Sequence, residues 1–195
     1  MTGKRRRGFI RKKPLRDYRK LFIIATEGAE TEPAYFAMFQ SQSATVRVKL
    51  LDSRHKSSPK QVFARAREYI IKQGLRKGDS VWLVLDRDNW TVKQLHAVFL
   101  WCQESLFHLA VSNPCFELWL LFHFQNGSSV TSARNCREKL LRELPNFEKG
   151  HVEIKKLEPL VPIAIKHAEQ KDNPPCFDWP RSIGSTVYRL VKELQ

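Results

Sequence analysis

The chain has 195 residues, of which 42% are hydrophobic and 28% are charged, so it is long and apolar enough to bury the core of one ordinary domain. This composition excludes a wholly disordered chain and a small scaffold held by disulfides. No apolar run approaches the ~18 residues of a membrane helix, and no apolar segment follows the basic N-terminus as in a secretory signal. The four cysteines form no CxxC pair. We therefore expect a reduced, cytoplasmic protein with no membrane partner.

The formal net charge is +14, and the excess of Lys and Arg is concentrated at the N-terminus. Residues 1–20 contain ten bases and one acid, which predicts a flexible basic arm in front of a domain over residues 21–195. Such an arm suits a polyanion, because neutralising phosphates releases counterions. A solvated tail or a contact with a membrane surface is the plainer alternative. The predicted nucleic-acid contacts are Arg5, Arg6, Arg7, Lys12 and Lys13 of the arm, and Arg54, His55 and Lys56 of a basic loop.

Apolar runs and helical periodicity alternate along the chain. Strands are predicted at residues 21–25, 46–51, 81–85 and 107–111, and helices at 31–39, 58–73, 91–104 and 115–124. Further helices are expected near 131–144, 151–171 and 183–194, among several prolines. Alternation of this kind predicts an α/β fold with a mostly parallel sheet, helices on both faces and a helical C-terminal part.

Carboxylates follow three of the predicted strands. Glu27 comes directly after the first strand, Asp86 and Asp88 after the third, and Glu117 early in the helix after the fourth. Because ligands of open parallel sheets bind at the carboxyl ends of the strands, we expect these side chains to meet. Like charges that meet need a counter-charge, and hard oxygen ligands suit Mg²⁺ or Mn²⁺. Asp86 and Asp88 would bind the metal, with Glu27 as a further ligand or as the base that activates water.

Each of these residues also has a structural interpretation. A lone D-x-D is most often a solvated turn, and Glu27 and Glu117 can simply complement a helix dipole. Glu32 is ambiguous between a role in the first turn of a helix and support of the site. Trp90 can cover the site or stack on a base, although packing is the simpler interpretation, and we expect a structural role for His123. The joint placement after apolar strands favours the metal site.

The same segments resemble known families. An apolar strand followed by Glu-Gly, and a later strand followed by Asp-x-Asp, is similar to the Toprim arrangement of topoisomerases, primases and OLD-type nucleases. EGAETEPAYF at 27–36 resembles the E-G-x-x-T-E-x-x-Y-F signature of the RloB family. VLDRD at 84–88, SNPCFELWLLFHF at 112–124 and STVYRLV at 185–191 resemble the other blocks of that family. Ala29-Glu30 departs from the signature, which commonly has an acidic and then a basic residue there.

The resemblance implies a Toprim-like (Rossmann-like) fold and metal-dependent phosphodiester chemistry in bacterial anti-phage defence, often beside an ATPase partner. It gives Glu27 the acid/base position and Asp86 and Asp88 the metal positions, while Glu117 completes or supports the site. Glu32 and Asn113 match signature positions as supporting residues. We therefore expect an Mg²⁺- or Mn²⁺-dependent nuclease acting on DNA or RNA. The alternative is a non-catalytic subunit that binds nucleic acid or an ATPase, and a weaker third hypothesis is a nucleotidyl-transfer or phosphate-ester enzyme. Oligomeric state and metal number stay open.

Overall fold

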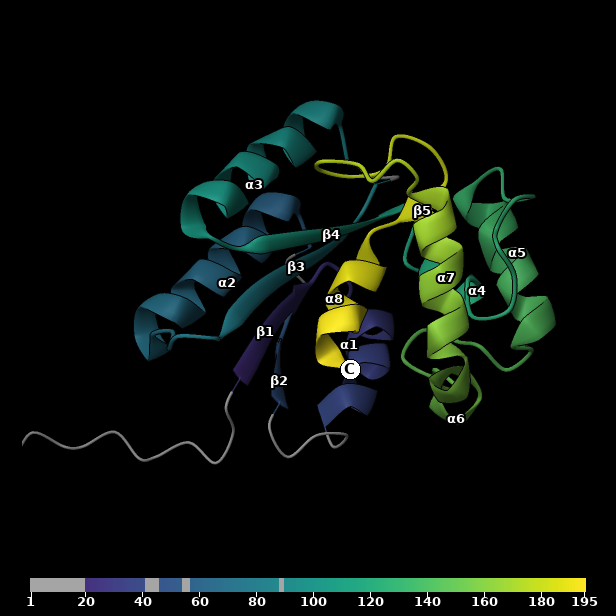
Figure 1. Ribbon diagram of the computed structural model, residues 1–195, viewed down its shortest axis with the longest axis horizontal. Coiled ribbons are helices and arrows are strands. Elements are labelled where there is room, and N and C mark those ends of the chain that lie inside the picture. Colours follow the sequence, from purple (N-terminus) through teal and green to yellow (C-terminus); the bar gives the residue numbers. More distant parts are fainter. Residues whose placement is uncertain (1–19, 41–45, 54–56, 88–89) are drawn as a thin grey trace, which may run out of the picture.

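A five-stranded sheet runs through the middle of the molecule (Figure 1). The computed structural model describes residues 20–40, 46–53, 57–87 and 90–195. The strand order is β2-β1-β3-β4-β5, with β1 to β4 mutually parallel and β5 antiparallel to β4. The strands are β1 (Lys20–Thr26), β2 (Val46–Leu51), β3 (Ser80–Asp86), β4 (His108–Asn113) and β5 (Gly184–Ser185).

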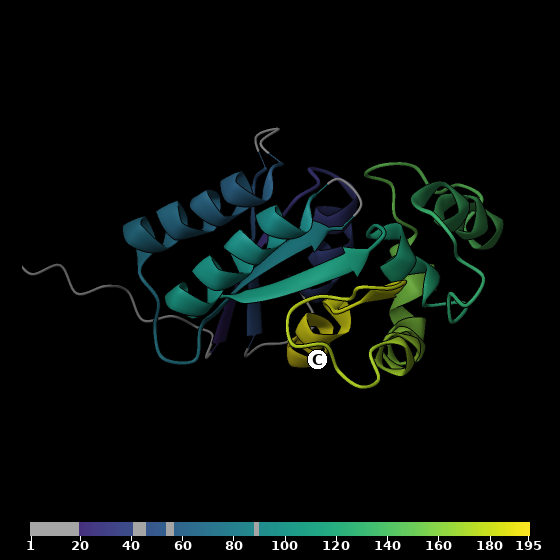
Figure 2. The ribbon, with the colours of Figure 1, turned by 90° about the horizontal axis from the view of Figure 1, so that it is seen from above.

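Helices cover both faces of this sheet, with α2 and α3 on one side and α1 and α8 on the other (Figures 1 and 2). The α-helices are α1 (Thr31–Ala37), α2 (Pro59–Gln73), α3 (Val92–Ser105), α4 (Glu117–Leu121), α5 (Ala133–Glu143), α6 (Ile154–Leu157), α7 (Val161–Lys171) and α8 (Val187–Leu194). Two 3₁₀ turns, η1 (Met38–Gln40) and η2 (Glu158–Leu160), complete the described elements. No helix among these described residues is long and apolar enough to cross a membrane.

The apolar run of β1 is buried on both faces because side chains of a strand alternate in direction. Phe22 and Ile24 pack in the core beneath α1 and α8, whereas Leu21 and Ile23 pack beneath α2 and α3. Such two-sided burial is the pattern of a parallel sheet enclosed by helices. The predicted fold class is therefore confirmed: the chain has an α/β, Rossmann-like fold with a mostly parallel sheet and a helical C-terminal part.

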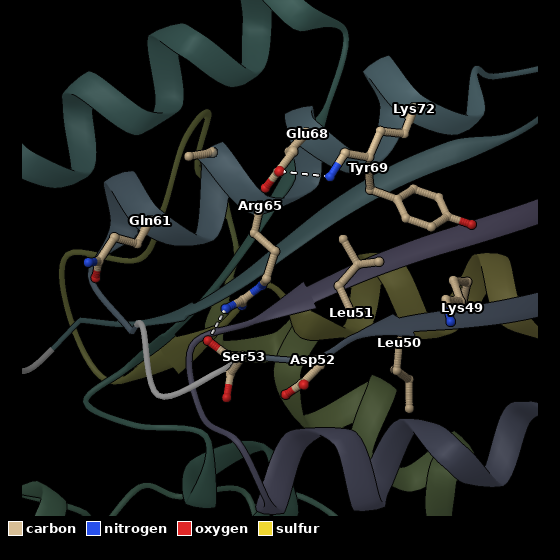
Figure 3. A pocket seen from close by; sticks show the side chains of 11 residues that line it. Lys49, Leu50, Leu51, Asp52, Ser53, Gln61, Arg65, Glu68, Tyr69 and Lys72 are labelled. Carbon is tan, nitrogen blue, oxygen red and sulfur yellow. Dashed lines mark hydrogen bonds and ion pairs between the residues drawn. The ribbon is translucent and has the colours of Figure 1, made fainter.

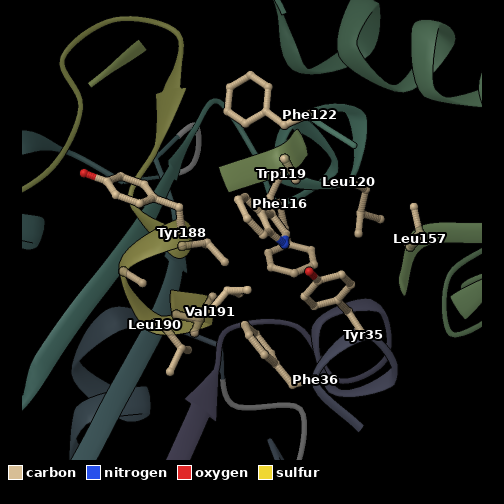
Figure 4. Close-up of a cluster of buried hydrophobic side chains, with 14 of the residues drawn as sticks. Tyr35, Phe36, Phe116, Trp119, Leu120, Phe122, Leu157, Tyr188, Leu190 and Val191 are labelled. Carbon is tan, nitrogen blue, oxygen red and sulfur yellow. The ribbon is translucent and has the colours of Figure 1, made fainter. Parts of the chain in front are cut away.

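The core under α1, α4 and α8 is rich in aromatic side chains (Figure 4). The ring of Tyr35 makes edge contacts with Phe36, Phe116 and Trp119, at centroid distances of 5.3, 5.7 and 6.1 Å. Its hydroxyl lies 3.3 Å from Nε2 of the buried His123. The His123 Nδ1 lies 3.1 Å from the carbonyl oxygens of Trp119 and Leu120, so an N–H at that position donates to them. The predicted structural role of His123 is confirmed.

Three of the predicted helices differ from the structure. The expected helix at 115–124 is too long, because α4 ends at Leu121 and the His123 ring binds carbonyls that a continuing helix would use. The expected helix at 151–171 is divided into α6, η2 and α7, since Pro159 and Pro162 cannot donate backbone hydrogen bonds. The expected helix at 183–194 is preceded by β5, which pairs with the end of β4.

Candidate active site

The connections that leave β1 and β3 run toward opposite edges of the sheet, so the switch point of the topology lies between the carboxyl ends of these two strands. From β1 the chain passes through α1 to β2, and from β3 it passes through α3 to β4 on the opposite side. The two helices leave toward opposite faces, so a crevice between the ends of β1 and β3 is the expected ligand position. Glu27 follows β1 and Asp86 ends β3, so both lie at this expected ligand position.

The register of the sheet brings Glu27 beside Asp86. Thr26 is opposite Val84, and the N–H of Glu27 continues the ladder by donating to the Val84 carbonyl at 2.9 Å. The backbone N–H of Asp86 in turn donates to Oε2 of Glu27 at 3.0 Å. Glu27 is 9% exposed, so its carboxylate is largely shielded from solvent, and the Asp86 N–H holds it in place.

Trp90 fixes the same carboxylate from the other side. Its indole Nε1–H lies 2.9 Å from both Oε1 and Oε2 of Glu27. Arg87 holds Trp90 there, because its Nη1 donates to the Trp90 carbonyl at 2.6 Å and its carbonyl accepts from the Trp90 N–H at 3.3 Å. The interpretation of Trp90 as packing alone is therefore incomplete, since its ring also donates a hydrogen bond to a candidate catalytic group.

Glu32 supports the turn that carries Glu27. Its Oε1 accepts from the N–H of Gly28 at 2.8 Å, and the side chain is buried. Burial raises the pKa of Glu32, and the nearby charge of Glu117 raises it further, while its backbone hydrogen bonds and Lys149 act in the opposite direction. Glu32 thus lies beside the turn that follows β1, close enough to Glu117 and Lys149 for their charges to act on it.

Glu117 and Asp86 both lie near the buried thiol of Cys115. A hydrogen bond with Cys136 and burial raise the pKa of the Cys115 thiol most, and the charges of Glu117 and Asp86 add to the increase. The charge of Glu117 therefore acts on the same buried thiol as the charge of Asp86. The predicted supporting residue Asn113 uses its side-chain amide to donate to the Pro180 carbonyl at 3.1 Å.

Several predicted site residues lie outside the described part of the chain. They are Asp88, the arm residues Arg5, Arg6, Arg7, Lys12 and Lys13, and the loop residues Arg54, His55 and Lys56. Their predicted roles stay predictions.

The donor set fits a hydrated Mg²⁺ ion. Mg²⁺ usually takes one or two carboxylates and completes its octahedron with water and substrate oxygens. Glu27 and Asp86 supply two carboxylates from neighbouring strand ends, and an ionised carboxylate has about four acceptor positions, so the bonds from Trp90 and Asp86 do not exhaust Glu27. Over the described ranges, no three His, Cys, Asp or Glu side chains group together to hold a metal. These residues alone would therefore leave most of the coordination to water.

Sequence reasoning missed Arg65 altogether. This α2 residue donates from Nη2 to the carbonyl of Thr26, next to Glu27, and from Nη1 to the Ser53 carbonyl at 2.8 Å. Burial lowers the pKa of Arg65, and the charge of Asp52 partly offsets that effect. The contact joins residues far apart in sequence, so the only available signal was a base at a half-buried helix position.

The comparisons with known proteins identify the family of the chain. The model of a family described as RloB-like protein matches residues 22–194. No curated protein and no solved structure matches the chain.

Proposed function

The chain belongs to the RloB-like family, and from that premise we propose that it is a metal-dependent nuclease that hydrolyses phosphodiester bonds in the cytoplasm. One observation carries the proposal: Glu27 and Asp86 stand together at the switch point of a parallel sheet, with the Glu27 carboxylate fixed by Trp90 and by the Asp86 N–H. A buried, oriented carboxylate beside a second carboxylate is the arrangement that metal-assisted phosphoryl chemistry needs.

Each residue of the site then has a stated role. Asp86, with Asp88 of the signature, would hold Mg²⁺ or Mn²⁺, which when bound neutralises phosphate charge and activates water. Glu27 accepts the proton of the attacking water or serves as a further ligand, and Trp90 positions it. Glu117 adds negative charge that favours a bound cation, Glu32 holds the turn that carries Glu27 through the Gly28 N–H, and Asn113 supports the end of β4.

The partners follow from charge and from family resemblance. The net charge of +14 favours a polyanion, so DNA or RNA is the proposed substrate, with the basic arm and the loop at 54–56 as its contacts. A role in bacterial anti-phage defence, beside an ATPase partner, is proposed from the resemblance described above.

The test measures metal binding and cleavage on the same samples. We expect wild type to bind Mn²⁺ in a calorimetric titration and to cleave labelled DNA or RNA, and Asp86→Ala to lose both while keeping its thermal melting temperature. Asp79→Ala, an acid remote from the switch point that lies before β3, is the matched control and should retain metal binding. Cleavage by Asp86→Ala at the wild-type rate would overturn the assignment.

Trp90→Phe separates positioning from packing. The ring remains, but the donor to both Glu27 oxygens is removed. A hydrogen bond to a charged group contributes about 1.5–3 kcal/mol, so we expect a roughly tenfold to hundredfold lower rate. The acid limb of the pH–rate profile should also move to higher pH, because the charged form of Glu27 loses a donor. A purely structural Trp90 would leave that limb in place.

The second candidate is a non-catalytic subunit that binds nucleic acid or an ATPase. It is favoured by the net charge of +14, which suits binding of a polyanion whether or not the site is catalytic. It predicts salt-sensitive binding of nucleic acid by wild type and by Asp86→Ala alike, without metal binding or cleavage in either protein.

A further inference from the structure

A pocket of about 490 Å³ lies beside the open edge of the sheet, between α2 and β2 (Figure 3). β2 is the terminal strand in the sheet order, so no described strand pairs with its outer side. Lys49 and Leu51, two residues apart on β2, line the pocket from the sheet, and Ser53 lines it beyond the strand end.

The α2 side of the pocket is one helical stripe. Positions 61, 64, 65, 68, 69 and 72 all line it, which is the i, i+3, i+4 spacing of a single helix face. The residues of α2 that pack on the sheet, Val62 and Ala66, are buried and apolar, whereas this stripe carries Arg65, Glu68 and Lys72. Tyr69 is its one aromatic residue.

Two features indicate a ligand. Lys49, Arg65 and Lys72 give the lining three cations against the two acids Asp52 and Glu68, and Lys72 contacts Glu68 at 2.9 Å. Ser53 is 4% exposed, and its hydroxyl has no hydrogen-bond partner within the part of the chain that the structure describes.

Arg65 connects this pocket to the candidate active site. The same guanidinium that lines the pocket donates to the carbonyls of Ser53 and of Thr26, the residue before Glu27. A phosphate at the Arg65 end of the pocket would therefore lie toward Glu27, and a base at the other end would lie by the Tyr69 ring (Figure 3).

We propose that this pocket binds one unpaired nucleotide of the substrate strand, with the base stacked on Tyr69, its phosphate held by Lys49 and Lys72 on the Tyr69 side, and the next phosphate of the strand at Arg65. Pockets for small ligands commonly have volumes of ~300–1,000 Å³, and stacking on an aromatic ring is tolerant of base identity. The inference rests on the proposed nuclease function and adds to it a substrate class, single-stranded or unpaired nucleic acid.

The first test uses adenosine 5′-monophosphate as the probe, with ribose 5-phosphate and inorganic phosphate as comparators. We expect the nucleotide to bind most tightly and to shift the backbone NMR signals of β2 and α2. Tyr69→Ala should weaken nucleotide binding about tenfold and leave ribose 5-phosphate binding unchanged, and Tyr69→Phe should bind like wild type. Equal affinity for all three ligands, or no shift at β2 and α2 with millimolar nucleotide, would overturn the proposal.

Further variants distinguish a loss of nucleotide binding from a loss of folding. Ala64→Trp fills the pocket without removing a core side chain and should abolish nucleotide binding. Lys49→Ala should weaken all three ligands, whereas Lys166→Ala, an exposed lysine on α7, should weaken none. Asp86→Ala should bind the nucleotide normally, so loss of cleavage in that variant tests the nuclease alone. Nucleotide binding that Ala64→Trp leaves intact would refute the pocket while leaving the nuclease assignment standing.

Discussion

Gly28 has no side chain at a position where Glu32 takes up the space. A Cβ built on Gly28 would come within 2.2 Å of Oε2 and 2.7 Å of Cδ of Glu32. Gly28→Ala should therefore displace the buried carboxylate from the Gly28 N–H and lower the free energy of unfolding by about 1–3 kcal/mol, measured by urea denaturation. Glu32→Gln keeps an acceptor of the same size and should change stability much less. Equal stability of Gly28→Ala and wild type would show that the carboxylate has room to move.

His123 makes the stability of the protein depend on pH. Burial lowers the pKa of His123 to about 4, and hydrogen bonds to the Trp119 and Leu120 carbonyls only partly offset this. The unfolded chain, with an ordinary histidine pKa near ~6.5, binds the proton first, so stability falls as pH drops from about 6.5 to about 4. The full loss is about 3 kcal/mol.

The measurement is urea denaturation at several pH values between 4 and 7. His123→Gln has no titrating ring, so it should start from a lower stability and lose less of it across this interval. A loss in His123→Gln as large as that of wild type would assign the pH dependence to other groups.

At the scale of elements, α7 and α8 are joined by one buried and one exposed ion pair. Asp172, at the end of α7, accepts from Nη2 of Arg189 at 2.6 Å and from the Tyr188 hydroxyl at 2.9 Å. Burial by itself would raise the pKa of Asp172, yet its hydrogen bonds with Cys176, Arg189 and Tyr188 hold that pKa below its usual value. The second pair, Lys192 with Glu169 at 2.7 Å, is solvent-exposed.

These two pairs provide a matched comparison. Arg189→Met leaves the buried Asp172 without its counter-charge and should lower the free energy of unfolding by about 3 kcal/mol. Lys192→Met removes an exposed pair between the same two helices and should cost less than about 1 kcal/mol. Chemical denaturation of both variants measures the difference. Similar losses in the two would mean that Asp172 is stabilised by its other donors.

The sequence predicts an element well when residues close together in the chain determine it, and poorly when contacts between distant residues do. Apolar runs located β1, β3 and β4, because two-sided burial makes those strands locally distinctive, and alternation of apolar and charged residues located the half-exposed β2. Helical spacing of apolar residues located α2. β5 has only two residues, Gly184 and Ser185, and exists through its pairing with β4, which no local pattern encodes. The end of α4 at Leu121 likewise depended on a side-chain contact, whereas Pro159 and Pro162 mark the break near residue 160 in the sequence itself.

The candidate site shows the same division. The rule for strand ends placed Glu27 and Asp86 at one edge from the sequence alone. The two donors that orient Glu27, from Trp90 and Asp86, are 63 and 59 positions away from it, and Arg65 is 39 positions from Thr26, whose carbonyl it binds. Such contacts arise only once the sheet register is set, so sequence patterns left the role of Trp90 open between covering the site, stacking on a base and packing, and overlooked Arg65.

At the scale of the whole molecule, positive charge is divided between the N-terminal arm and the domain. We therefore expect each of them to contribute separately to the binding of a polyanion. Residues 1–19 contain nine bases and one acid, and the rest of the chain carries a smaller excess spread over many more residues. The described chain begins at Lys20, which pairs with Glu193 of α8 at 2.9 Å, so a truncation should keep that residue. Removing residues 1–19 thus leaves the first strand and its ion pair intact.

The salt dependence of binding separates the two parts. We expect deletion of residues 1–19 to weaken binding of a labelled oligonucleotide and to reduce the slope of log K against log salt by about 0.7–0.9 for each phosphate that the arm no longer neutralises. A full-length variant with the nine bases replaced by Gln tests charge at constant length and should match the deletion. Cleavage at low salt should persist in both, because Glu27 and Asp86 are unchanged. An unaltered salt slope in the Gln variant would show that the arm does not bind the phosphates, and the polyanion surface would then have to lie on the domain itself.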